Sequence, residues 1–134
     1  MSSNKILIKE KTIVKPIGLT VTSTEDAPVT MLYCRYTTSP KYNCGWWVNI
    51  YKTCILQDTI SGKSIKMITA INIPYAPSKH FLKKLGDSLT FILVFPRIPK
   101  DWVVFDFIEG RSEDSLSSHG ILRNDSGIYR IQVS

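Results

Sequence analysis

The chain has 134 residues, of which 43% are apolar and 21% are charged. These proportions are typical of a globular protein with a sizeable core, and they exclude a disordered chain. We therefore expect one domain spanning residues 1–134. The formal charge of +6 suits an anionic partner, but the Lys and Arg residues are scattered, as on an ordinary solvated surface.

The sequence shows neither an apolar stretch that could span a membrane nor the features of a signal peptide. No apolar stretch approaches the roughly 20 residues that cross a bilayer, so we expect no membrane span. The first residues, MSSNKILIKEK, lack the apolar core and cleavage site of a signal peptide. The sequence thus predicts a cytoplasmic protein, unless a leader was removed from this chain.

The first half reads as short β-prone runs separated by turn residues. This pattern predicts strands at 5–9, 12–22, Val29–Thr37 and Trp46–Leu56. In the last of these runs alternate positions are apolar, which places Trp46, Val48 and Ile50 on one buried face.

The second half begins with an expected strand at Lys66–Ile73. Over Ser78–Leu85, a capping serine and a glycine just past the end predict a short helical turn. Leu89–Phe95 and Trp102–Ile108 are apolar on both faces, so we expect a hairpin of two core strands around the connector Pro96–Asp101.

The remaining elements complete an all-β chain. Arg111–Ser118 is expected to be a polar loop, and Ile128–Val133 the last strand. Seven or eight short strands at this spacing predict a sandwich or a barrel, of which we expect an antiparallel β-sandwich. Its core is expected to contain Trp46, Val48, Ile50, Phe91, Leu93, Phe105 and Phe107.

The three cysteines, Cys34, Cys44 and Cys54, lack the paired spacing of a zinc or redox site. We expect small buried side chains at Cys34 and Cys54. A disulfide between Cys44 and a neighbour stays open if the compartment is oxidising.

The residue pattern gives little support for enzymatic catalysis or for a metal-binding site. His80 and His119 have no ligand spacing, and no nucleophile lies in an elbow sequence, so we expect no enzyme, no cofactor and no metal. The acidic residues Asp106, Glu109, Glu113 and Asp114 offer oxygen ligands for Ca²⁺. They lack the pattern of a calcium loop, which favours a solvated role.

Aromatic residues provide the best binding candidate. Tyr42 and Trp47, with Lys41 beside them, are expected to form a platform on which sugars or bases stack. Trp46 points to the other face of its strand and is expected in the core.

Several segments resemble a known family. Val29–Tyr36, the stretch GWWVNI from Gly45, Ile71–Pro74 and LTFILVFPRIPKDWVVFDFIEG occur in order. Together they resemble the immunoglobulin-like β-sandwich accessory domains of exported Bacteroidetes proteins, which often precede thioredoxin-like domains. The resemblance implies the fold and a periplasmic, outer-membrane-associated or secreted location, and it supplies no catalytic residues. Asp114-Ser115 also resembles the O-glycosylation site of such proteins, with Ser115 as acceptor.

Three function hypotheses follow. The first is a non-catalytic exported binding or scaffolding module that contacts a protein partner or an adjacent domain. The second is carbohydrate binding through Tyr42 and Trp47. The third, which the scattered charge disfavours, is a basic barrel that binds single-stranded nucleic acid.

Overall fold

The computed structural model describes residues 29–39, 46–110 and 115–134. The strands expected at 5–9 and 12–22 lie outside the described residues, as do Lys41, Tyr42 and Cys44. The described part contains no helix and ten strands. The strands are β1 (Val29–Thr37), β2 (Trp46–Val48), β3 (Ile55–Asp58), β4 (Ser64–Lys66), β5 (Thr69–Ile71), β6 (His80–Leu82), β7 (Ser88–Pro96), β8 (Val104–Ile108), β9 (Ser117–Leu122) and β10 (Ile128–Val133).

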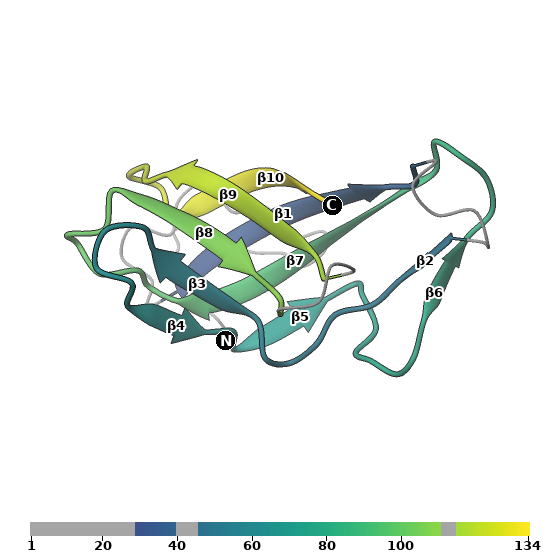
Figure 1. Cartoon of the computed structure of the whole chain (residues 1–134), viewed down its shortest axis with the longest axis horizontal. Coiled ribbons are helices and arrows are strands. Elements are labelled where there is room, and N and C mark those ends of the chain that lie inside the picture. Colours follow the sequence, from purple (N-terminus) through teal and green to yellow (C-terminus); the bar gives the residue numbers. More distant parts are fainter. Residues whose placement is uncertain (1–28, 40–45, 111–114) are drawn as a thin grey trace, which may run out of the picture.

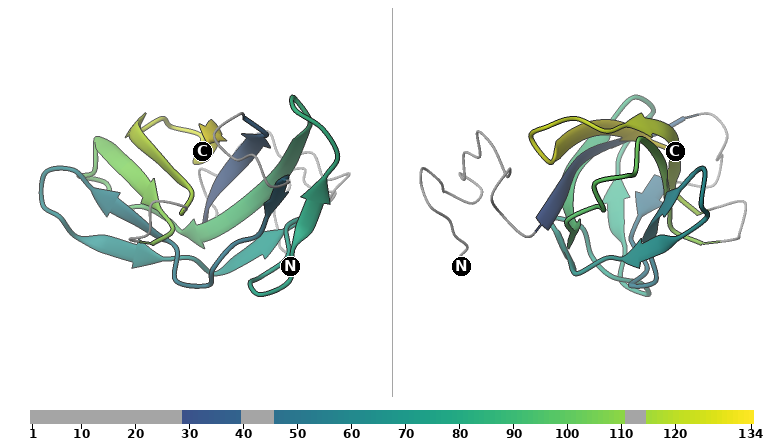
Figure 2. Two further views of the ribbon diagram at one scale, coloured as in Figure 1. Left: turned by 45° about the vertical axis from the view of Figure 1, so that its right-hand side comes forward. Right: turned by 90° about the vertical axis from the view of Figure 1, so that its left-hand side faces the viewer.

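Most strands belong to two four-stranded sheets (Figure 1). One, here called the β1–β7 sheet, has the order β10-β1-β7-β5, and the other, the β3–β8 sheet, has the order β4-β3-β8-β9. Figure 2 shows the two sheets facing each other around a common interior. The all-β sandwich expected from the sequence is confirmed. Neighbouring strands are antiparallel except β1 and β10, which run parallel.

Backbone hydrogen bonds join the two sheets along both sides. On one side the segment 64–71 passes from β3 to β7: Met67 N donates to Cys54 O at 3.0 Å, and Ile68 N donates to Val94 O at 2.7 Å. On the other side Ser117 and Ser134 exchange bonds of 3.1 and 3.4 Å. Both sheets thereby satisfy backbone groups that an open edge would expose.

The core forms because the long strands alternate. Every second residue of β1 and β7 points inward, and the facing residues of β8 meet them. The rings of Phe95 and Phe107 meet edge to face across the sandwich at 6.4 Å. The core expected at Val48, Ile50, Phe91, Leu93, Phe105 and Phe107 is confirmed.

Trp46 was expected in this core and is only half-buried. Its indole Nε1 donates to the Ser39 carbonyl at 3.1 Å, which holds the ring at the end of β1 rather than between the sheets. Trp102 is the tryptophan of the core, with 2% of its surface exposed.

The expected hairpin of Leu89–Phe95 and Trp102–Ile108 is wrong. β7 pairs with β1 and β5, whereas β8 pairs with β3 and β9, so the proline connector carries the chain from one sheet to the other. Two side chains fix this crossing: Thr30 Oγ1 accepts from Ile98 N at 3.1 Å, and Arg123 Nη1 donates to Trp102 O at 3.2 Å.

The helical turn expected at Ser78–Leu85 is also absent, and the predicted strand Trp46–Leu56 is divided. His80–Leu82 forms β6 and pairs with β2, in the register Trp46 to Leu82, Trp47 to Phe81 and Val48 to His80. A neighbouring β-prone strand outweighs a weak local helix preference. We call this pair of strands, with Lys79 and the turn 83–87, the ribbon.

Part of the segment expected as a polar loop is β9. Only Leu116 and Ile121 of this region are buried, because the strand lies at a sheet edge. The register of its pairing with β8 shifts between Phe105 and Phe107. This irregularity breaks the alternation of buried and exposed side chains by which a strand is recognised in a sequence.

Candidate functional site: the outer face of the β1–β7 sheet

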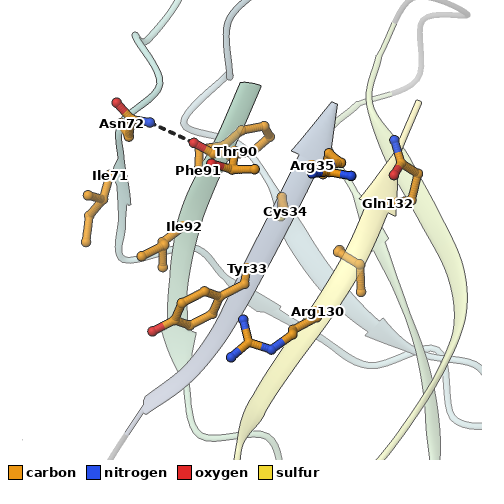
Figure 3. A pocket seen from close by; sticks show the side chains of 11 residues that line it. Tyr33, Cys34, Arg35, Ile71, Asn72, Thr90, Phe91, Ile92, Arg130 and Gln132 are labelled. Atoms are coloured by element: carbon orange, nitrogen blue, oxygen red, sulfur yellow. Dashed lines mark hydrogen bonds between the residues drawn. The ribbon is translucent and has the colours of Figure 1, made fainter. Parts of the chain in front are cut away.

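The outward side chains of the β1–β7 sheet form a shallow hollow of about 1000 Å³ (Figure 3). We call this surface the Tyr33 face. It is lined by side chains from four strands and from the residue after β5, namely Tyr33, Arg35, Ile71, Asn72, Thr90, Ile92, Arg130 and Gln132.

Strand register sets the order of the side chains on this face. Tyr33 lies opposite Ile92 on one side and Arg130 on the other, and Ile92 lies opposite Ile71. Since neighbouring strands are about 4.8 Å apart, these four side chains form one row across the sheet. Its centre is apolar and aromatic, and one end is cationic.

Tyr33 and Arg130 are in direct contact. The Arg130 guanidinium lies 4.9 Å from the centroid of the Tyr33 ring, within cation–π distance. Burial raises the pKa of the Tyr33 hydroxyl, and the positive charge of Arg130 opposes part of that rise. The phenol therefore stays neutral around pH 7 and can donate a hydrogen bond.

The next row is polar. Arg35 lies opposite Thr90 and Gln132, and Asn72 donates to the Thr90 carbonyl at 2.7 Å. Asn72 has φ 67°, a left-handed conformation that asparagine tolerates, and this bond holds its amide at the edge of the hollow. Among the described residues, neither Arg35 nor Arg130 forms an ion pair.

The ribbon carries two exposed aromatic residues. Trp47 is 45% exposed and Phe81 is 68% exposed, and the two occupy directly opposite positions on β2 and β6. Lys79 Nζ lies 4.5 Å from the Trp47 ring centroid. Trp47 is thus on the surface, while its predicted companions Tyr42 and Lys41 lie outside the described residues. Sequence reasoning missed Phe81 because a helical turn was expected there.

Glu109 was expected to be a solvated acidic residue, and that expectation is wrong. Only 4% of it is exposed, and its carboxylate accepts from Tyr51 N at 2.9 Å and from Leu116 N at 2.8 Å. Burial raises the pKa of the Glu109 carboxyl, while these two N–H donors oppose the rise. Glu109 therefore joins two loops at one end of the sandwich.

The acidic residues do not assemble into a metal site in the described part of the chain. Asp106 accepts from Gly120 N at 2.8 Å and lies 3.4 Å from His119 Nδ1, apart from the partners of Glu109. Glu113 and Asp114 lie outside the described residues. Ser115 is half-buried, and its glycosylation stays a prediction.

Cys34 and Cys54 are buried free thiols, as expected. Burial raises the pKa of both, so neither forms an appreciable thiolate at neutral pH.

In a Cys44→Ser background we expect a thiol reagent to leave both cysteines unmodified in the native protein, because labelling requires the core to open. Absorbance after addition of a chromogenic disulfide reagent measures this. Rapid labelling in native buffer, equal to that in denaturant, would contradict the burial of both groups.

Comparison with known proteins gives no match to a family description, a curated protein or a solved structure. No helix in the described residues is long and apolar enough to cross a membrane.

Proposed function

We propose that this chain is a non-catalytic binding module that contacts a protein partner through the Tyr33 face. The observation that carries the proposal is the row Arg130, Tyr33, Ile92 and Ile71 across a hollow in the sheet. Tyrosine and arginine are the residue types that dominate the energetic centres of protein interfaces, and an apolar centre with a polar margin is the usual composition.

Charge supports a particular kind of partner. Arg35 and Arg130 project from the same face and have no carboxylate partner among the described residues. A partner segment with acidic and apolar side chains would supply the missing counter-charges and cover Ile71 and Ile92. The resemblance to accessory domains of exported Bacteroidetes proteins favours an extracytoplasmic role, with an adjacent domain or a separate protein as the partner.

A carbohydrate ligand is less well supported by the same surfaces. Sugars stack on bare aromatic rings, whereas Arg130 lies against Tyr33 and Lys79 lies over Trp47. Abolition of glycan-array binding by Trp47→Ala would favour that alternative. Binding of single-stranded DNA that weakens steeply with salt would favour the nucleic-acid hypothesis.

The proposal is tested by selecting binders from a random peptide display library. We expect enriched peptides to combine acidic and apolar residues. Arg130→Ala and Arg35→Glu should each weaken a selected peptide by about tenfold or more, because each removes a charged contact at the interface. Fluorescence anisotropy of the labelled peptide measures the affinities.

Lys66→Glu is the matched control, since Lys66 is an exposed cation on the other sheet. Peptides whose affinity falls with Lys66→Glu, but not with the arginine variants, would place the binding surface elsewhere and contradict the proposal.

A further inference from the structure

The ribbon, with β2 and β6, lies at one end of the molecule (Figure 1), and it exposes apolar side chains. Trp47, Phe81 and Leu85 are 45%, 68% and 54% exposed, respectively. Leaving large apolar side chains in water costs free energy that burial would recover. A group of such side chains in a structured segment therefore indicates a surface that a binding partner covers.

Hydrogen bonds between Thr38 and the turn 83–87 hold the ribbon in place, and they thereby fix which of its side chains are exposed. Thr38 Oγ1 donates to Lys84 O at 3.0 Å and accepts from Gly86 N at 2.7 Å, and Thr38 N donates to Asp87 O at 2.9 Å. On the inner side, Val48 is buried and Leu82 packs against the core. The outward rings cannot turn inward without breaking these contacts.

The ribbon also carries three lysines. Lys79 lies over Trp47, and Lys83 and Lys84 follow β6 directly and are exposed. Asp87, the nearest acidic residue in the sequence, uses its Oδ2 to accept from the backbone N–H groups of Lys83 and Lys84, both at 3.2 Å. Among the described residues, none of these three ammonium groups forms an ion pair.

The side chains of the ribbon favour one class of partner over others. Neither of the hollows on the β1–β7 sheet and between β9 and β10 includes a ribbon residue. A single-stranded nucleic acid is usually held along a charged groove, and a sugar needs a bare ring face. A lipid surface needs no concave site, only apolar side chains that enter the interface and cations that meet the headgroup phosphates.

We propose that the ribbon docks the protein onto an anionic lipid surface. Trp47, Phe81 and Leu85 enter the boundary between headgroups and acyl chains, and Lys79, Lys83 and Lys84 contact lipid phosphates. This is reversible attachment to one leaflet, and it uses a different surface from the protein-binding face.

The test uses vesicles of phosphatidylcholine and phosphatidylglycerol in equal parts, with pure phosphatidylcholine vesicles alongside. We expect sedimentation with the anionic vesicles that weakens as salt rises. Phe81→Ser should weaken binding by about tenfold or more, and each Lys→Gln change at Lys79, Lys83 or Lys84 by about fivefold. In a Trp46→Phe background, bound protein should show quenching of Trp47 emission by brominated lipid, because the remaining tryptophan, Trp102, is buried.

Ile60→Ser and Lys66→Gln are the matched controls. Ile60 is 83% exposed in the turn between β3 and β4, at the other end of the molecule in Figure 1. Both controls should bind like the parent protein, and thermal unfolding should show Phe81→Ser to be folded. Failure to bind anionic vesicles, binding unaffected by Phe81→Ser, or ribbon-dependent binding of single-stranded DNA without vesicle binding would each overturn the proposal.

Discussion

Trp102→Ala should lower the free energy of unfolding by about 3–5 kcal/mol. The side chain is 2% exposed, and its ring packs against Phe105 with centroids 6.4 Å apart. Trp102 lies where the proline connector delivers the chain from β7 to β8, so alanine would leave a cavity at the crossing between the sheets. Chemical denaturation followed by circular dichroism measures the loss.

Val103→Ala is the control for this prediction, because Val103 is the next residue and is 56% exposed. It should change the free energy of unfolding by no more than about 0.5 kcal/mol. If Trp102→Ala cost as little as Val103→Ala, the ring would not be part of the core that this fold requires.

Glu109→Ala should lower the free energy of unfolding by about 2–4 kcal/mol at neutral pH, since two backbone donors lose their acceptor. Tyr51 N and Leu116 N both donate to this carboxylate, from loops on opposite sides of it. Asp106→Ala is the control: it removes a carboxylate on the outer side of β8 that, among the described residues, accepts from one backbone N–H, that of Gly120. Equal losses in the two variants would contradict the role of Glu109 in joining the loops.

The same carboxyl also predicts a pH dependence. Its pKa in the folded protein is raised above the ordinary value of 4.5, so the folded state holds this proton more tightly than the unfolded state. The proton-linked part of the stability that Glu109 provides is therefore complete below about pH 4.5 and is lost as the pH rises through the raised pKa, whereas its hydrogen bonds to Tyr51 N and Leu116 N remain. The Glu109→Gln variant has no group at this position that titrates. The free energy of unfolding of the parent protein minus that of the variant should therefore fall as the pH rises across that window. A difference that rises with pH would contradict the effect of burial.

The long strands were predictable from the sequence. β1, β7 and β10 are continuous β-prone runs of six or more residues, and their predicted bounds match the structure to within one residue. Three-residue strands such as β2 and β6 carry too little local signal, and they exist because each supplies the other's hydrogen bonds. The immunoglobulin-like family resemblance stays a prediction, while the all-β sandwich is confirmed.

The candidate site was less predictable, for a physical reason. The alternation of β1 places Tyr33 and Arg35 on one side of the strand, but it does not show which neighbours they meet. Arg130 reaches Tyr33 because β10 pairs with β1 in parallel, across almost a hundred residues of chain. Glu109 looked solvated because it follows β8 among polar residues, and the contacts with Tyr51 and Leu116 that hold it in a buried position are visible only in the structure.

The central claim is that the Tyr33 face is the surface that contacts a protein partner. The most direct measurement is a map of backbone amide chemical-shift changes on titration with a peptide selected against the domain. We expect the largest changes on β1, β7 and β10, centred on Tyr33, Ile92 and Arg130. Changes confined to the β3–β8 sheet, with none on this face, would contradict the claim.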